Sequence, residues 1–246
     1  MRIELRGLKK RFQTLQALKG LDLTIASGRH QALVGPNGSG KSTLIRAILG
    51  LIQCEGQVLL DGRSPYESRV ELAQSIAYVP QVAPQLMASV QEIVDMVALT
   101  RGLDQERISS VAARFDLSLS ALAAKSFRSL SGGMKQKLLL SIAFASPAKL
   151  FVLDEPTASL DPRAKHDVET LVAEFTSGGL EPDGDRPVSL VFASHNLGQV
   201  KRLATRVIYL EHGRVLADLP VEQFFNGPLL QAQYPAAHLF VKGELP

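Results

Sequence analysis

Residues 35–42 read Gly-Pro-Asn-Gly-Ser-Gly-Lys-Ser, the most informative segment of the chain. Residues 31–34 have the composition of a short buried strand, and residues 43–49 have the apolar spacing of a helix. A glycine-rich turn between a strand and a helix is the setting of a phosphate-binding P-loop. Its glycines let the backbone approach phosphate oxygens, and the amides at the helix start point their positive dipole at the anion. The sequence therefore predicts a triphosphate-binding turn in an α/β fold.

Two side chains of this turn have chemistry of their own. Lys41 is placed to reach the β- and γ-phosphates, and the Ser42 hydroxyl is placed to hold Mg²⁺. The remaining predicted nucleotide-binding positions are Gly35, Pro36, Asn37, Gly38, Ser39, Gly40 and Thr43. An ordinary glycine-rich loop is the alternative, and the flanking strand and helix argue against it.

Composition limits the class of protein. The 246 residues are 46% hydrophobic and 21% charged, and a net charge of +3 is too small to indicate nucleic acid as a partner. The longest mainly apolar run, residues 138–145, is too short to cross a bilayer, and residues 1–6 contain no apolar signal-peptide core. The single cysteine, Cys54, fits a reducing compartment. We therefore expect a cytoplasmic location.

Apolar patterning extends the α/β prediction along the chain. Alternating side chains predict half-buried strands near the N-terminus, and two continuous apolar runs predict central parallel strands. The predicted strands span residues 3–6, 21–25, 56–61, 75–79, 150–153 and 188–193. After about residue 213 we expect a strand, a short helix and an irregular end, and residues 176–187 read as a surface loop.

The pattern becomes helical between about residues 88 and 124. One predicted helical face carries Val90, Ile93, Val94, Val97 and Ala98, and another carries Ile108, Val111, Ala112 and Phe115. We expect one domain over residues 1–246, with a P-loop NTPase core of mixed, largely parallel sheet and an antiparallel β edge subdomain. The expected parts are a core at about 1–81 and 138–220, an inserted helical lobe at about 82–137, and a C-terminal tail at about 221–246.

A second motif follows the apolar run 150–153, which ends in Asp154 and Glu155. An acidic pair at the carboxyl end of a central strand lies beside the P-loop in an open α/β sheet. Asp154 is placed to hold Mg²⁺ through its water shell, and Glu155 to polarise a water for attack on the γ-phosphate. The alternative is a turn that happens to be acidic, and the neighbouring P-loop argues against it.

A third motif resembles the signature sequence of a known protein family. Residues 130–137, Leu-Ser-Gly-Gly-Met-Lys-Gln-Lys, resemble the signature of the ATP-binding-cassette (ABC) ATPases, although Met134 stands where glutamine is frequent. The other matches are the adenine-stacking aromatic at Phe12, the Q-loop glutamine at Gln81, the D-loop at Ser159-Leu160-Asp161 and the switch histidine at His195. The resemblance covers about residues 2–220 and implies ATP hydrolysis with ATP and Mg²⁺ bound.

The resemblance also implies a nucleotide-sandwich dimer. Residues Ser131, Gly132 and Gly133 of one copy would face the ATP on the P-loop of the other, as an anion-binding helix start. Asp161 would cross the interface, and Gln81 would contact Mg²⁺ at a hinge between core and lobe. His195 would bind the γ-phosphate, the alternative being a satisfied core histidine.

In this family the cassette drives a membrane permease, so the resemblance implies a peripheral location on the inner face of the cell membrane. Residues 82–87 could form part of the permease groove or simply lobe core. Residues 194–204, 224–226 and 243–245 are similar to cassettes serving tungstate-type oxyanion importers, which also use an extracytoplasmic substrate-binding protein. The open alternatives are phosphate or molybdate importers, an exporter, a soluble non-transport cassette and a non-hydrolysing regulatory binder.

Overall fold

The computed structural model describes residues 1–158, 160–176 and 188–244. Ser159 of the predicted D-loop, residues 177–187 of the predicted surface loop and Leu245 lie outside the described residues. Within the described ranges, no helix has both the length and the apolar character that crossing a membrane requires.

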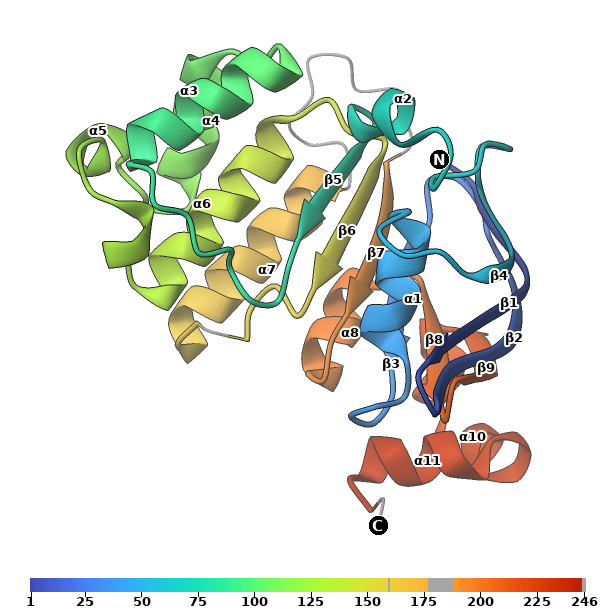
Figure 1. Cartoon of the computed structure of the whole chain (residues 1–246). Helices are drawn as coiled ribbons and strands as arrows, with labels where there is room; N and C mark the ends of the chain where they lie inside the picture. Colours follow the sequence, from blue (N-terminus) through green and yellow to red (C-terminus); the bar gives the residue numbers. More distant parts are fainter. Residues whose placement is uncertain (159, 177–187, 245–246) are drawn as a thin grey trace.

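A six-stranded sheet forms the centre of the molecule (Figure 1). Its order is β5 (Ile76–Val79), β6 (Leu150–Asp154), β7 (Ser189–Ala193), β3 (His30–Val34), β8 (Arg206–Glu211) and β9 (Arg214–Pro220). All neighbouring pairs are parallel except β8 and β9, which are joined by a tight turn. The carboxyl ends of the parallel strands therefore lie at one edge of the sheet, where the predicted P-loop and acidic pair both follow a strand.

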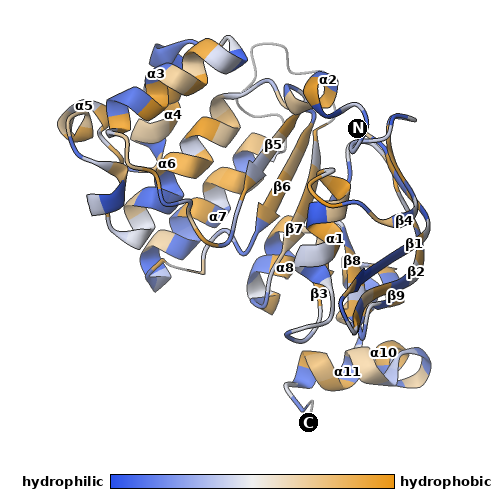
Figure 2. Cartoon of the chain, viewed as in Figure 1, coloured by the Kyte–Doolittle hydropathy of each residue, from blue (hydrophilic) through white to orange (hydrophobic). Residues whose placement is uncertain are grey.

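Apolar layers cover both faces of this sheet. Leu33 of β3 packs in one core with Leu44 and Ile45 of α1 (Lys41–Ile48), whereas its neighbour Val34 packs in the other with α6 (Gly132–Ala145) and α7 (Pro162–Thr176). Figure 2 shows the resulting hydrophobic colour along β6. Because both faces are buried, the central strands read as continuous apolar runs rather than alternating ones.

A three-stranded antiparallel sheet adjoins the first core, in the order β2 (Leu15–Ile25), β1 (Ile3–Phe12) and β4 (Glu55–Leu60). The strands β1 and β2 form a hairpin in which Phe12 pairs with Leu15 across a two-residue turn. Both strands are longer than the sequence pattern indicates, because polar side chains such as Lys9, Arg11 and Gln16 interrupt the apolar alternation at their outer ends.

Helices follow β5, as the periodicity predicts. They are α3 (Val90–Arg101), α4 (Gln105–Arg114), α5 (Leu119–Leu122), a short turn of 3-10 helix (Phe127–Ser129) and α6. A capping box between Ser89 and Glu92 begins α3, and the predicted apolar faces of α3 and α4 are buried, with Val97 half-buried. The short α2 (Arg69–Ala73) precedes β5, and α8 (Leu197–Leu203) follows β7. The predicted α/β fold with an inserted helical part and an antiparallel edge sheet is confirmed.

The prediction of an irregular C-terminal end is wrong. After β9 the chain forms three helices, α9 (Val221–Phe224), α10 (Gly227–Gln233) and α11 (Pro235–Lys242). Asn226 caps α10, accepting a hydrogen bond from the Leu229 amide at 3.4 Å. The Phe240 ring lies 5.4 Å from that of Tyr209 on β8. These helices are too short to show a clear period, and packing on the core stabilises them.

Replacement of Leu33 tests the central core. Leu33 is fully buried, so Leu33→Ala is expected to lower the free energy of unfolding by about 2–5 kcal/mol through lost burial and a cavity. Leu99→Ala is the matched control, because Leu99 is 86% exposed on α3, and it is expected to change that free energy by less than about 0.5 kcal/mol. Denaturant unfolding measures both, and equal effects would contradict the assigned core.

Candidate active site

The predicted P-loop connects β3 to α1 in a conformation that requires glycine. Gly35 has φ of 145°, and a Cβ there would lie 2.0 Å from the Leu210 carbonyl oxygen. Gly40 has φ of 110°, and its Cβ would lie 2.8 Å from the Ala17 carbonyl oxygen. Close packing against two other strands therefore sets the shape of the loop, in addition to any ligand.

Lys41 begins α1 and is only 8% exposed. Its ammonium donates hydrogen bonds to the carbonyl oxygens of Gly35 at 2.8 Å and Pro36 at 3.0 Å. Burial lowers the pKa of Lys41, and the negative charges of Glu155 and Asp154 partly oppose that shift. A buried cation held by neutral carbonyls is well placed to exchange them for an anion.

A cavity of about 240 Å³, which we name the P-loop pocket, opens over this turn. It is lined by Phe12, Leu15, Ala17, residues 37–43, Gln81, Asp154, Glu155 and His195. The structure thus brings together predicted residues from five separate segments of the chain. Gly35 and Pro36 do not line the pocket themselves. Their carbonyl oxygens accept the hydrogen bonds from Lys41.

The acidic pair lies at the carboxyl end of β6. Burial raises the pKa of Asp154, while a hydrogen bond from Ser42 and the charges of Arg46, Lys41 and His195 act in the opposite direction. Glu155 has φ of 51°, a left-handed conformation that costs a non-glycine residue about 1–3 kcal/mol. Its amide donates to the Ala193 carbonyl at 3.1 Å, which ties the pair to β7.

His195 follows β7 and lies against Glu155. Its Nε2 is 3.1 Å from Glu155 Oε1, and its amide donates to Glu155 Oε2 at 3.4 Å. The imidazole is 45% exposed whereas the carboxylate is 11% exposed. The alternative of a satisfied core histidine is therefore wrong, because the side chain is exposed and lines the P-loop pocket.

The donors in this pocket suit Mg²⁺ in combination with phosphate. Ser42 offers a hydroxyl, Asp154 a carboxylate and Gln81 an amide oxygen, all hard ligands of the kind that Mg²⁺ prefers. Among the described residues, no group of three or more His, Cys, Asp and Glu side chains could hold a metal ion. These few donors fit an ion that keeps several waters and shares a nucleotide's phosphates.

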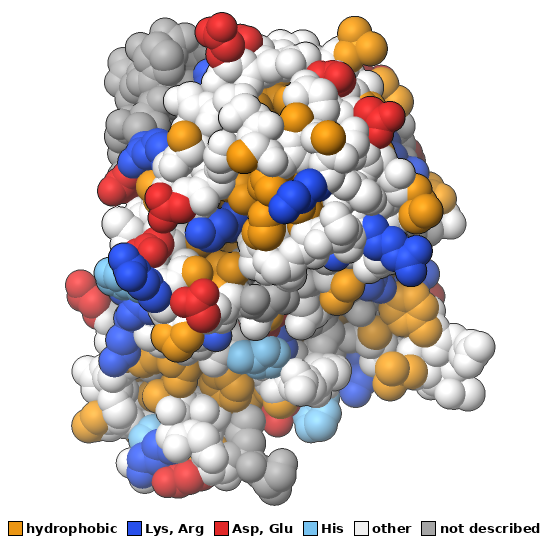
Figure 3. Space-filling model, turned by 90° about the vertical axis from the view of Figure 1, so that its left-hand side faces the viewer, with side chains coloured by type: hydrophobic (Ala, Val, Ile, Leu, Met, Phe, Trp, Pro, Cys, Tyr) orange, Lys and Arg blue, Asp and Glu red, His pale blue; other side chains and the backbone are white. Residues whose placement is uncertain are grey.

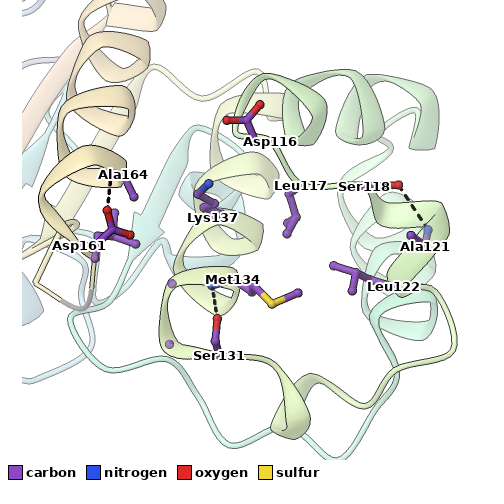
Figure 4. Close-up of a pocket in the computed structure, with 13 residues that line it drawn as sticks. Asp116, Leu117, Ser118, Ala121, Leu122, Ser131, Met134, Lys137, Asp161 and Ala164 are labelled. Carbon is purple, nitrogen blue, oxygen red and sulfur yellow. Dashed lines mark hydrogen bonds between the residues drawn. The ribbon is translucent and has the colours of Figure 1, made fainter.

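The predicted signature residues form a second hollow, of about 690 Å³, which we name the signature pocket (Figure 4). Ser131 caps α6, its hydroxyl accepting a hydrogen bond from the Met134 amide at 3.2 Å. Asp161 caps α7, accepting from the amides of Arg163 and Ala164 at 3.1 Å each. These bonds, with the charge of Lys137, lower the pKa of Asp161.

Figure 3 shows the side of the molecule that carries α3, α4, α5 and α6, where one group of hydrophobic side chains lies near the centre with charged side chains around it. Within the described part of the chain, the lining of the signature pocket and that of the P-loop pocket have no residue in common. The two predicted half-sites of one chain are therefore separate hollows.

Sequence reasoning missed two residues of the P-loop pocket, Leu15 and Ala17. Leu15 lines the pocket because the two-residue hairpin turn pairs it with Phe12. An apolar pattern on both sides of a two-residue turn is the sequence signal that could have indicated this pairing. In the signature pocket it missed residues from the segment between α4 and α5, from α5 and from α7, namely Asp116, Leu117, Ser118, Ala121, Leu122 and Ala164.

A glycine-rich turn, a buried lysine and an acidic pair at the end of a central strand define a P-loop nucleotide-binding protein. Residues 18–158 match the family model of the ABC transporters. The chain belongs to the ABC transporter family, as one of its ATPase subunits.

Two relatives illustrate the similarity. The nickel import ATP-binding protein NikO of Rhodobacter capsulatus is 35% identical over 232 residues, covering 89% of each chain. The tungstate uptake system ATP-binding protein TupC of Peptoclostridium acidaminophilum is 31% identical over 218 residues, covering 87% of this chain and 97% of TupC.

A solved ATP-binding cassette, a dimer in a post-hydrolysis state with ADP and Pi, has the same fold. Its TM-score is 0.77 at 23% identity, covering 89% of this chain and 98% of that one.

The raised pKa of Asp154 predicts that this carboxylate destabilises the protein when no nucleotide is added. The native state binds its proton more tightly than the unfolded state, so stability falls as pH rises through the carboxyl range. Asp154→Asn is therefore expected to raise the thermal midpoint at pH 7 without nucleotide, by an amount that shrinks as the pH falls. Asp167→Asn, on the exposed face of α7, is the control and should leave the midpoint unchanged. A lower midpoint for Asp154→Asn at pH 7 would contradict burial as the dominant influence on this carboxylate.

Proposed function

We propose that this ATPase drives transport through a membrane permease, and that the residues of the P-loop pocket perform the hydrolysis. The observation that carries the proposal is the meeting of Lys41, Glu155 and His195 in one cavity. A buried cation, a carboxylate and an imidazole are the groups that phosphoryl transfer to water needs around a γ-phosphate.

In this proposal the triphosphate draws the Lys41 ammonium away from the Gly35 and Pro36 carbonyls. Ser42, Asp154 and Gln81 hold Mg²⁺, which neutralises charge on the phosphates when bound. Glu155 accepts a hydrogen bond from the attacking water and so orients it in line with the bond that breaks. His195, already 3.1 Å from Glu155, donates to a γ-phosphate oxygen.

Phe12 is proposed to stack on the adenine ring, with Leu15 beside it. Both line the P-loop pocket, and Phe12 is 40% exposed, so its ring is accessible to a ligand. Phenylalanine serves as well as tyrosine at this position, because stacking uses only the face of the ring.

The second half-site is proposed to come from another copy of the chain. Ser131, Gly132 and Gly133 begin α6, a helix of 14 residues whose free amides and dipole favour an anion. They line a hollow separate from the P-loop pocket, and a two-fold axis can bring the hollow of one copy to the pocket of the other. Asp161, in the same hollow, would then face the partner's nucleotide.

A groove of about 330 Å³ offers a place for the permease. It lies between the end of α1, the segment around α2 and Arg101 of α3, and it is mostly apolar. Val70, Val82, Met87 and Leu99 are strongly exposed apolar residues on the neighbouring elements. We propose that a permease segment docks in this groove, that the lobe of about residues 82–137 rotates about Gln81, and that the protein lies against the inner face of the membrane.

For the cargo we propose a tungstate-type oxyanion, taken up with an extracytoplasmic binding protein. The proposal rests on the short stretches after His195 and near the C-terminus and on the 31% identity to TupC. A nickel cation is the second candidate, because NikO is 35% identical over a similar span.

Glu155→Gln tests the hydrolytic mechanism. Glutamine keeps the shape of the side chain but cannot act as the water-orienting base, so turnover of ATP is expected to fall at least about 100-fold. Binding of ATP, measured by calorimetry, is expected to persist, and the variant is expected to elute as an ATP-dependent dimer in size-exclusion chromatography. Turnover at the parent rate would rule out this role for Glu155.

Lys41→Ala is the contrasting variant, because it removes the cation that the phosphates would use. It is expected to lose ATP affinity, and unchanged affinity in calorimetry would contradict the P-loop assignment. The pair of variants separates loss of binding from loss of chemistry.

Deletion of the gene in its host tests the cargo. Under limiting tungstate and nickel, the tungsten content of the cells is expected to fall while the nickel content stays at the parent level. Loss of nickel alone would favour the second candidate, and no change in either element would contradict both. A complementing gene with Glu155→Gln is the control, because it is expected to restore the protein without restoring uptake.

A further inference from the structure

Lys10 lies over the ring of the proposed adenine-stacking residue. Lys10 and Phe12 are two residues apart on β1, and side chains at this spacing share one face of a strand. The Lys10 Nζ is 5.0 Å from the centroid of the Phe12 ring. A cation within about 6 Å of an aromatic face is attracted by the ring quadrupole.

The ammonium of Lys10 has a second, fixed contact. It donates a hydrogen bond to the Gln53 carbonyl oxygen at 2.8 Å. Gln53 lies between α1, which begins with the P-loop lysine, and β4. Lys10 therefore connects the hairpin that carries Phe12 to the segment that follows the P-loop helix.

The Phe12 ring needs such a connection. It is 40% exposed near the tip of a hairpin, beside a two-residue turn in which Gln13 has φ of 49°. An exposed aromatic side chain loses rotamer freedom when a base stacks on it, and this loss weakens binding. A cation over one face holds the ring in place and leaves the other face for a planar ligand.

We propose that Lys10 is a positioning residue for recognition of the purine base. Its ammonium, anchored on the Gln53 carbonyl, holds the Phe12 ring in the orientation in which the free face stacks on the base of the bound nucleotide. The inference rests on the proposed function, because it takes Phe12 as the base-stacking residue. It assigns to Lys10 an effect on the base and none on the phosphates.

Calorimetry with two ligands tests this assignment on the full chain with magnesium present. Lys10→Gln is expected to weaken binding of ATP about two- to fivefold, the range that an exposed cation–π contact supplies. Binding of inorganic tripolyphosphate, which has no base, is expected to stay at the parent level. Lys10→Arg keeps a cation over the ring and is expected to restore the parent affinity for ATP.

Two controls separate ring positioning from general charge and from folding. Lys9→Gln removes the same charge from the adjacent exposed position and is expected to leave both affinities unchanged. In a Phe12→Leu background, Lys10→Gln is expected to have no further effect on ATP binding, because the ring through which it acts is gone.

The binding results distinguish failure of the Lys10 inference from failure of the proposed function. Unchanged ATP affinity in Lys10→Gln, or an equal loss for ATP and tripolyphosphate, would overturn the inference while leaving the proposed function intact. A parent protein that binds tripolyphosphate but not ATP would overturn the proposed function and this inference together.

Discussion

The P-loop pocket is organised around the buried ammonium of Lys41 and its hydrogen bonds to the carbonyl oxygens of Gly35 and Pro36. Lys41 lies in a loop whose shape is imposed by close approach of Gly35 to the Leu210 carbonyl and of Gly40 to the Ala17 carbonyl. It donates hydrogen bonds to two carbonyl oxygens of its own loop, and the negative charges of Glu155 and Asp154 act on it. Gly38, Gly40, the acidic pair and Phe12 all line the same pocket as this cation.

The predicted second anion-binding helix start lies apart from the P-loop. The start of α6 and the Asp161 cap of α7 share the signature pocket, whereas Lys41 and Glu155 share the P-loop pocket. This separation is the physical basis for proposing a two-fold dimer, and the apolar groove beside α2 is the basis for proposing a permease. In that arrangement the rate of ATP turnover would depend on dimer formation, because the P-loop pocket of one copy needs the signature residues of the other.

Much of the fold was predictable because its signals are local. The central strands β6 and β7 read as continuous apolar runs, and the face of α3 that carries Val90, Ile93 and Val94 repeats with helical spacing. The C-terminal helices were not predictable in this way. Their short lengths leave no clear period, and contacts such as that between Phe240 and Tyr209 stabilise them from far away in the sequence.

The fold class, the family and the chemistry of individual residues can be read from the sequence, because motif spacing and apolar periodicity are properties of neighbouring residues. The domain boundaries and the roles of the site residues remain predictions from it. Three features require the folded structure: His195 lies against Glu155, Leu15 lines the pocket with Phe12, and the P-loop pocket and the signature pocket are separate. These are contacts between residues far apart in the chain or across a turn, and packing of the sheet and helices sets them.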